Sequence, residues 1–581
     1  MTVESSTFRA PLPNISILDR LDPEARISLE SQLIWFSLPG GKVLFEAAEP
    51  PSGIYIVLTG CLGIIVDPQT RRRPPIFVQA GNIIGQYSLL SGHPQPHTCV
   101  AVRDTLLAWL DREAFERLLR DYPRSVLPFV LQLIELFDRV LALRPNSIVG
   151  AKTLAFIPLH SGVEIELAAR KLSAAVNDSG KKAIACDREV FEEPSDQIQA
   201  IEASHELVIY VGSATDIEWT RTCVRQSDSV FLVGMASDPP ICEKRLLEEI
   251  VALPWRSTQL VLLQTDGATT APAKPWLDQY HVSFHTHVRL NSGDDFARLA
   301  RYVTGRAVGL VLSGGGARGF AHLGVIKALR ESGIPIDLVG GASMGAIIAC
   351  GVGLEFNDSE LYSSALEGFV TSNPINDYTI PLVSLIRGRK VERHLEKRFA
   401  GIQAEDLWLP FFAVASNLSS GETCVMRRGS VVRMLQASAA IPGLMPPIIE
   451  DGDVLVDGGV MNNLPCDVLD ADRRGPIIGV DVTRYRMQDM SVSKSKEWLR
   501  RLFAPPNYVG PGIVSTLLRA ATVGGNFLTK NERDHADLVL DPPLQAVDIR
   551  DWKSFDRAIE VGYRHAMERM EELHRIVQLA P

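Results

Sequence analysis

The sequence predicts a multidomain protein: an N-terminal β-barrel or jelly roll with helices, a central α/β Rossmann-like linker domain, and a C-terminal α/β domain with a mainly parallel sheet. Three observations support this prediction. The chain has 581 residues, several times the length that one hydrophobic core serves. Its first part alternates short apolar runs with turns rich in glycine and proline, which is typical of antiparallel sheets. The remainder alternates apolar strand patterns with helical patterns, which indicates βαβ units and parallel sheets.

We place the three domains at residues 1–145, 148–303 and 306–575, because Pro145 and Gly305 interrupt the pattern at the two junctions. In the first domain, helices are expected at about 112–120 and 126–143. Its strand candidates are residues 42–45, 53–58, 61–66 and 106–110.

Two segments of the first domain resemble the cyclic-nucleotide-binding domain family: Gly53-Ile-Tyr-Ile-Val-Leu-Thr-Gly60 and the run from Gly85 to Thr98. The resemblance implies a phosphate cassette with a Glu for the ribose hydroxyl and an Arg for the cyclic phosphate. Gln86 and Gln95 occupy those positions here, so the charged partner of the phosphate is missing. We therefore expect no cyclic-nucleotide binding, and a domain kept for packing or for contact with a partner.

The composition excludes several classes of protein. A net charge of -10 argues against a general nucleic-acid binder. The eight cysteines are scattered without any C-x-x-C, so we expect no zinc site and a reducing compartment. The first residues lack an apolar signal core, and no run of 18 apolar residues occurs. We expect a cytoplasmic protein that touches membranes only at its periphery and holds no metal and no organic cofactor.

The central domain predicts a parallel sheet without catalytic residues. Its strand candidates are residues 153–158, 183–186, 207–211, 230–234 and 260–264. A phosphate-binding loop after the first strand would need a glycine-rich turn and a Lys, and the sequence Pro158-Leu-His-Ser-Gly-Val163 has neither. We expect a linker or docking domain that does not hydrolyse nucleotides.

The third domain carries the candidate chemistry, beginning with two glycine loops in one βαβ unit. An apolar strand runs into Gly314-Gly-Gly-Ala-Arg-Gly319, and a second strand ends in Gly341-Ala-Ser343-Met-Gly345, which opens an apolar helix. The parallel strands should bring both loops to the carboxyl edge of the sheet. The second loop fits a nucleophile elbow that exposes the Ser343 hydroxyl, while the first offers backbone N–H groups for an oxyanion hole.

A serine nucleophile needs a base, and Asp457 is the best candidate because it ends an apolar strand and precedes Gly458 and Gly459. Desolvation should raise the pKa of this carboxyl. A triad with a histidine is the rival interpretation, and the available histidines are His322, His535, His565 and His574. Other readings of the first loop are a dinucleotide fingerprint, which lacks its acidic residue at the end of the second strand, and a loop used only for packing.

The motifs 314–319, 341–345 and 457–459, in this order, resemble the patatin-like phospholipase family over about residues 306–485. The resemblance implies a Ser–Asp dyad that cleaves acyl esters of lipids. Ser343 is then the nucleophile and Asp457 the base. The implied oxyanion donors are Gly314, Gly315 and Gly316, and the supporting motif residues are Arg318, Gly319, Gly341, Gly345, Gly458 and Gly459.

Three further segments are similar to the neuropathy target esterase branch of that family, which acts on lysophospholipids: residues 404–412, 443–448 and 457–465. In the last segment, Asn462 and Asn463 are expected to brace the Asp457 loop. The implied function is a lysophospholipase or phospholipase, with phospholipase A and triacylglycerol lipase as alternatives. A ligand-sensing or scaffold protein with an inactive hydrolase domain is the alternative from another class.

One surface segment bears on how a lipid would arrive. Residues 387–398 hold six basic and two acidic side chains, directly after the apolar stretch 380–386. An apolar patch beside a basic one suits a membrane interface, and an ordinary solvated helix explains the same pattern.

Overall fold

The computed structural model divides the chain into two compact units, one built mainly from residues 1–305 and the other mainly from residues 306–581. It describes residues 18–65, 76–142, 152–191, 200–240, 258–472, 474–483 and 532–578, apart from residues 203, 266, 268–269, 374–375 and 381. The N-terminal segment expected to lack a signal core lies outside these described residues. The division into three domains stays a prediction.

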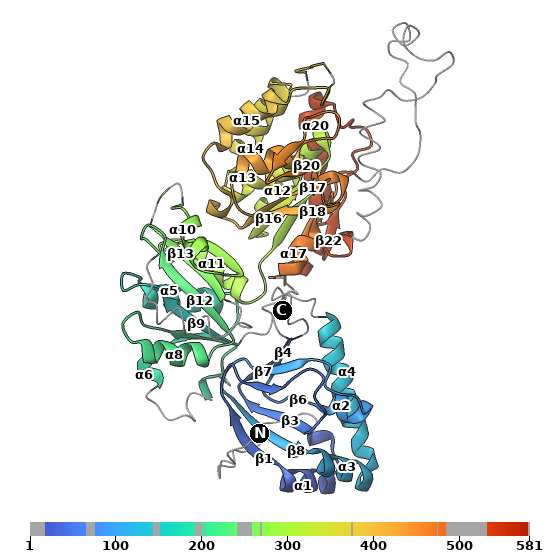
Figure 1. Ribbon diagram of the computed structural model, residues 1–581. Coiled ribbons are helices and arrows are strands. Elements are labelled where there is room, and N and C mark those ends of the chain that lie inside the picture. The colour runs from blue at the N-terminus through green and yellow to red at the C-terminus, as the bar shows by residue number, and fades with distance from the viewer. Residues whose placement is uncertain are drawn as a thin grey trace, which may run out of the picture. The chain divides into compact units, whose positions relative to one another are not determined.

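The first part of the N-terminal unit is a pair of four-stranded antiparallel sheets, ordered β1-β8-β3-β6 and β2-β7-β4-β5 (Figure 1). Along β1 and β8 single more exposed positions separate one or two buried ones, as in strands with one face on the core. This confirms the predicted barrel or jelly roll. The strands are β1 (Ile34–Leu38), β2 (Val43–Phe45), β3 (Gly53–Thr59), β4 (Cys61–Ile65), β5 (Ile76–Gln79), β6 (Ile83–Ile84), β7 (Thr98–Ala101) and β8 (Thr105–Asp111). The helices are α1 (Pro23–Gln32), α2 (Gln86–Ser91), α3 (Arg112–Asp121) and α4 (Val126–Ala142).

The second part of the N-terminal unit is a six-stranded, wholly parallel sheet ordered β10-β11-β9-β12-β13-β14. The central strand β9 is buried along its whole length, which explains its unbroken apolar sequence. This confirms the Rossmann-like linker fold. The strands are β9 (Thr153–Pro158), β10 (Ala183–Cys186), β11 (Leu207–Val211), β12 (Ser229–Met235), β13 (Thr258–Gln264) and β14 (Phe284–Arg289). The helices include α5 (Ile165–Asp178), α6 (Arg188–Phe191), α8 (Ile217–Arg225), α10 (Lys274–Gln279) and α11 (Gly293–Val303).

The C-terminal unit is built on an eight-stranded mixed sheet ordered β19-β20-β17-β16-β15-β21-β22, with β18 also pairing with β17. The strands from β17 to β22 in this order run parallel, whereas β18 and β20 are antiparallel to β17. The strands are β15 (Gly309–Leu312), β16 (Leu338–Ala342), β17 (Phe411–Asn417), β18 (Glu422–Met426), β19 (Ile448–Glu450), β20 (Asp453–Asp457), β21 (Ile477–Val480) and β22 (Leu538–Leu540).

Helices pack around this sheet, and α13 (Met344–Gly353) lies deepest, with all ten residues buried. Its sequence is apolar on every side, as a helix enclosed by others requires. The remaining helices are α12 (Ala321–Glu331), α14 (Asp358–Ala365), the π-helix η4 (Leu366–Thr371), α15 (Arg389–Phe399), α16 (Val431–Ser438), α17 (Cys466–Asp472), α20 (Phe555–Glu568) and α21 (Met570–Gln578). Within the described residues, no helix combines the length and apolar character needed to cross a bilayer.

Candidate active site

Ser343 occupies a sharp turn between β16 and α13, as the elbow motif predicts. Its φ of 52° lies in the left-handed region, which costs a non-glycine residue about 1–3 kcal/mol. Its N–H donates a hydrogen bond of 2.9 Å to Ser438 Oγ, which helps to hold the turn. A Cβ at either Gly341 or Gly345 would lie 2.2 Å from the carbonyl oxygen of Leu312, so only glycine fits beside β15 at both positions.

Asp457 meets Ser343 directly, although 114 positions separate them in sequence. The Ser343 hydroxyl donates to Asp457 Oδ2 at 2.7 Å, and Asp457 Oδ1 accepts the N–H of Gly459 at 2.8 Å. The sheet brings the two residues together. Asp457, the last residue of β20, pairs with Ala415 of β17, and β17 is the neighbour of β16, the strand that precedes the elbow. Both side chains are buried, with exposed fractions of 9% for Ser343 and 7% for Asp457.

Burial dominates the electrostatics of the Asp457 carboxyl. Desolvation raises its pKa from 3.8 to about 6, against the opposing effect of the hydrogen bonds from Ser343 and Gly459. The direction is the one that the sequence predicts. A carboxylate with this pKa is ionised near neutral pH and is also basic enough to take a proton in a reaction.

The histidines that a triad would require are hydrogen bonded elsewhere. His322 Nε2 lies 2.9 Å from the Ser313 carbonyl oxygen, and burial lowers its pKa to about 4. His535 Nδ1 lies 2.7 Å from Asp470 Oδ2. His565 accepts the N–H of Asp541, and His574 lies against the carbonyl oxygen of Met570. The geometry favours a dyad over a triad.

The glycine loop 314–319 lies beside the elbow, because β15 and β16 are adjacent parallel strands. A Cβ at Gly314 would come within 3.1 Å of the Ser343 Cβ. The Gly314 N–H donates to the Asn463 carbonyl oxygen at 3.3 Å, so this donor is engaged within the protein. Within the described residues the N–H groups of Gly315 and Gly316 have no acceptor, which leaves these two as the better oxyanion donors.

The other motif residues shape the two loops. The Arg318 Nε–H donates to the Val547 carbonyl oxygen at 2.7 Å in a buried position, which fits a structural role. A Cβ at Gly319 would come 2.4 Å from Met344 Cγ, and one at Gly458 would come 2.4 Å from the Val414 carbonyl oxygen. Glycine at both positions therefore allows the loops to pack against the elbow helix and β17.

The two asparagines expected to brace the Asp457 loop lie close to it. Asn462 donates from Nδ2 to Asp467 Oδ1 at 2.8 Å, which ties the loop to α17. A Cβ at Gly459 would come 2.7 Å from Asn463 Oδ1, so the second asparagine packs on the loop itself. The Asn463 side chain also donates to Thr483 Oγ1 at 3.4 Å.

Three contributors to the site were missed in the sequence. Ser438 holds the Ser343 N–H, and Ser416 donates from Oγ to the Asp457 carbonyl oxygen at 2.9 Å. Both belong to ordinary apolar segments, so no local pattern distinguishes them. The N–H of Met344 opens α13 and has no intrahelical acceptor, which makes it a third possible oxyanion donor. The elbow motif itself is the signal that would have identified it.

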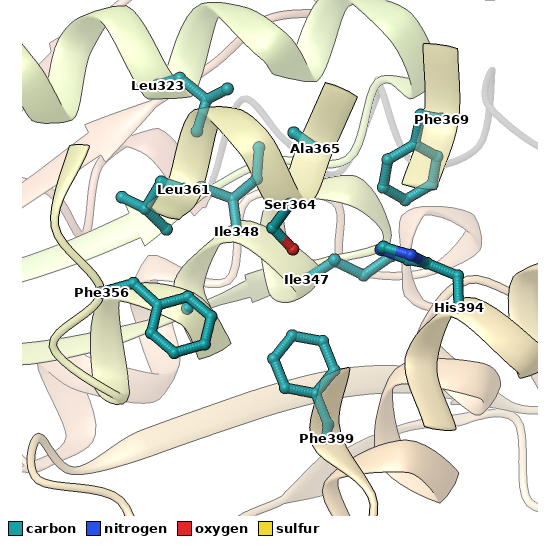
Figure 2. A pocket seen from close by; sticks show the side chains of 11 residues that line it. Leu323, Ile347, Ile348, Phe356, Leu361, Ser364, Ala365, Phe369, His394 and Phe399 are labelled. Carbon is teal, nitrogen blue, oxygen red and sulfur yellow. The ribbon is translucent and has the colours of Figure 1, made fainter. Parts of the chain in front are cut away.

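A mainly apolar pocket lies along α13, which begins directly after Ser343. Ile347 and Ile348 of this helix line one side of the pocket. The Ile347 N–H donates a hydrogen bond of 3.2 Å to the Ser343 carbonyl oxygen, so Ile347 lies one helical turn after Ser343. Figure 2 shows the rings of Phe356, Phe369 and Phe399 around the same space. Its lining is mainly apolar, with Ser364 and His394 as the polar side chains.

Comparison with known proteins matches each part of the chain to a family. Residues 35–122 match the cyclic nucleotide-binding domain, residues 150–294 match the "Neuropathy Target Esterase family P-loop like domain", and residues 310–470 match the patatin-like phospholipase family. The chain is thus similar in all three parts to proteins that combine these domains.

Individual relatives align with nearly the whole of this chain. An uncharacterized NTE family protein of Mycobacterium tuberculosis is 29% identical over 572 residues, which cover 95% of both chains. The human patatin-like phospholipase domain-containing protein 6 is 28% identical over 95% of this chain, which corresponds to 45% of the human protein. The neuropathy target esterase sws of Drosophila melanogaster is 28% identical over 94% of this chain and 43% of its own length. Over nearly its whole length the chain is therefore similar to the neuropathy target esterase branch of the patatin-like phospholipases, a family of lipid hydrolases, and it carries an N-terminal cyclic-nucleotide-binding-like domain.

Proposed function

We propose that this protein is a serine lipid-ester hydrolase, a lysophospholipase, in which Ser343 is the nucleophile and Asp457 the base. The observation that carries the proposal is the buried 2.7 Å hydrogen bond from Ser343 Oγ to Asp457 Oδ2, beside a glycine loop in which the Gly315 and Gly316 N–H groups have no acceptor among the described residues. These are the parts that acyl transfer needs: an activated hydroxyl, a proton acceptor and donors for the developing oxyanion.

The proposed reaction has two steps. Ser343 Oγ attacks the ester carbonyl carbon while Asp457 takes its proton, and the N–H groups of Gly315 and Gly316 stabilise the oxyanion. Collapse of this intermediate expels the glycerol oxygen, which leaves with the proton that Asp457 returns. Water then attacks the acyl-enzyme with Asp457 again as base, and the fatty acid is released as Ser343 recovers its proton.

Two observations favour a lipid substrate. Ile347, one helical turn from Ser343, belongs to the lining of a small and mainly apolar pocket, so apolar side chains lie near the proposed nucleophile. The relatives named above carry phospholipase and esterase in their names. Phospholipase A and triacylglycerol lipase activities are alternatives that use the same dyad.

The test is fatty-acid release from lysophosphatidylcholine by the wild type and two variants. We expect Ser343→Ala and Asp457→Asn each to lower kcat by about a thousandfold or more, since each removes one half of the activated nucleophile. Asp451→Asn is the matched control, because Asp451 lies on the exposed turn before the same strand and its φ of 50° suits asparagine. A wild type inactive on lysophospholipid, diacyl phospholipid and short esters alike would overturn the proposal in favour of a scaffold role.

A further inference from the structure

A short loop of the C-terminal unit carries a concentration of exposed apolar side chains. Among the described residues, the four most exposed large hydrophobic side chains all fall between positions 378 and 383. The exposed fractions are 72% for Tyr378, 76% for Ile380, 89% for Leu382 and 70% for Val383. We call residues 377–386 the apolar loop. A contiguous exposed group of this kind marks an interaction surface.

Hydrogen bonds fix the base of the apolar loop, so the exposure of its tip follows from a defined backbone. Tyr378 and Ile386 form an antiparallel bridge, and the Thr379 N–H donates to the Leu385 carbonyl oxygen at 3.0 Å. Ser384 donates from Oγ to the Ile386 carbonyl oxygen at 2.7 Å. The Ile386 side chain is fully buried and anchors the loop to the core while the tip residues face solvent.

Basic side chains follow the apolar loop directly in the sequence. Arg387, Arg389 and Arg393 are exposed, and the guanidinium groups of all three lack an ion-pair or hydrogen-bond partner within the part of the chain that the structure describes. Residues 387–393 hold four basic side chains and one acidic side chain, Glu392. Arg389 opens α15, where the helix dipole disfavours a positive charge. The stability of the helix therefore does not explain this cation, whereas an anionic partner outside the protein does.

The apolar loop is attached to the segment that holds both dyad residues. The N–H groups of Leu385 and Ile386 donate to the carbonyl oxygens of Gly443 and Leu444, each at 3.0 Å. In the same segment, residues 438–444, the Ala440 carbonyl oxygen accepts the Asp457 N–H at 2.9 Å, and Ser438 holds the elbow. One stretch of seven residues thus connects the apolar loop to the catalytic edge of the sheet.

We propose that the apolar loop is a membrane-docking element that inserts into an anionic lipid surface, with Arg387, Arg389 and Arg393 contacting the headgroup phosphates. Insertion of aliphatic side chains and attraction between cations and anionic lipid are the two signals that together give stable peripheral binding. Docking in this way sets the catalytic edge of the sheet at the lipid surface. Only this last use of the element rests on the proposed hydrolase function, because the binding itself needs no turnover.

The test measures binding of the full chain, in the Ser343→Ala background, to two kinds of vesicle by flotation. Vesicles of phosphatidylcholine mixed with phosphatidylserine should bind the parent more tightly than vesicles of phosphatidylcholine alone, and the difference should shrink in high salt. Ile380→Asp with Leu382→Asp should weaken binding to both kinds by about a hundredfold, because two inserted side chains are lost. Arg387→Glu with Arg389→Glu should weaken binding only to the anionic vesicles, by about 25-fold.

The controls separate docking from folding and from catalysis. Glutamate at position 389 suits the helix dipole, so loss of binding by that variant does not report a damaged helix. Ile27→Asp replaces an equally apolar side chain, 68% exposed, on α1 of the other unit and should leave vesicle binding unchanged. In the active chain, the docking variants should keep the wild-type rate on a soluble short-chain ester and lose it on vesicle lipid. Equal vesicle binding by the parent and the Ile380→Asp, Leu382→Asp variant would refute the proposal, whatever the outcome of the hydrolysis test.

Discussion

The elbow of the C-terminal unit and the cassette of the N-terminal barrel are both sites that sequence motifs point to, and their physical states differ. At the elbow, Ser343 sits at a φ of 52° and Asp457 is a buried carboxyl whose pKa is raised to about 6. At the cassette, the residues with positive φ are Gly85 and Gly92, for which the conformation carries no strain. The two glutamines at its expected ligand positions are buried and neutral, with exposed fractions of 1% for Gln86 and 5% for Gln95.

The two sites also differ in whether their polar groups are already hydrogen bonded within the protein. In the cassette, Gln86 Nε2 donates to the Ile83 carbonyl oxygen at 3.2 Å, and the Ser88 hydroxyl donates to Gln95 Oε1 at 2.9 Å. The two glutamines of the cassette thus form hydrogen bonds within the cassette. Beside the elbow, the Asp457 carboxyl and the N–H groups of Gly315 and Gly316 are placed where a substrate could use them. Backbone strain and a desolvated carboxyl are typical of reactive centres, and among these two sites only the elbow combines them.

The largest expected effect is on stability. Because burial holds the pKa of Asp457 at about 6 instead of 3.8, the ionised carboxyl destabilises the native state at pH 7 by about 3 kcal/mol. The native state binds the extra proton between these two values, so this penalty is absent below about pH 4 and complete above about pH 6. Asp457→Asn should therefore raise the free energy of unfolding by up to about 3 kcal/mol at pH 7 and by nothing at pH 4.

Chemical denaturation at the two pH values measures this difference. The exposed Asp451→Asn is the control and should stay within about 0.5 kcal/mol of the wild type at both. A destabilised Asp457→Asn at pH 7 would show that hydrogen bonds to the carboxylate outweigh its desolvation.

The next effect is on the rate. Asp457 accepts a proton only when ionised, so kcat/KM should fall as the pH drops through about 6. For a single titrating base with this pKa, the rate at pH 4 should be about a hundredfold below its high-pH plateau and about fiftyfold below its value at pH 6. A soluble short-chain ester keeps membrane binding out of the measurement, and circular dichroism at each pH checks that the chain stays folded. An acid limb centred near pH 4 would mean that the carboxyl is solvated in the free enzyme.

A smaller effect should separate strain from chemistry at the elbow. Ser343→Gly and Ser343→Ala both remove the nucleophile, but only glycine relieves the strain of a positive φ. We expect Ser343→Gly to be more stable than Ser343→Ala by about 1–2 kcal/mol, after allowance for the greater flexibility of glycine in the unfolded chain. Thermal unfolding of the pair measures it, and equal Tm values would mean that the turn relaxes in the alanine variant.

Sequence motifs located the elbow, the glycine loop and Asp457 because the backbone at or next to each of them requires glycine, and these glycines are visible in the sequence. Gly341 and Gly345 are needed against the Leu312 carbonyl oxygen whatever else the chain does. The contributions of Ser416 and Ser438 depend on which strands and helices meet, and no spacing in the sequence encodes that meeting.

The same limit explains the incomplete predictions of the sheets. The strands β1, β5 and β7 of the barrel are four or five residues long and were missed, because runs of this length lack a decisive period. The strand that ends at Asp457, β20, was expected, but its antiparallel pairing with β17, like that of β18, depends on contacts distant in sequence. The predicted parallel core, β15 with β16, comes from one local βαβ unit and is confirmed.

The smallest expected effect is the response of the cassette to cyclic AMP. A bound cyclic phosphate would need a cation, and Gln95 offers a neutral amide whose oxygen already accepts from Ser88. Binding would also break this buried hydrogen bond without an ionic one to replace it. Titration of the full chain with cyclic AMP should therefore release no heat, and an excess of ligand should leave the Tm unchanged, since a ligand that does not bind the native state cannot stabilise it. Micromolar affinity would show that the cassette rearranges around the nucleotide. The cassette would then be a ligand-binding site, and its internal hydrogen bonds would not distinguish it from the elbow.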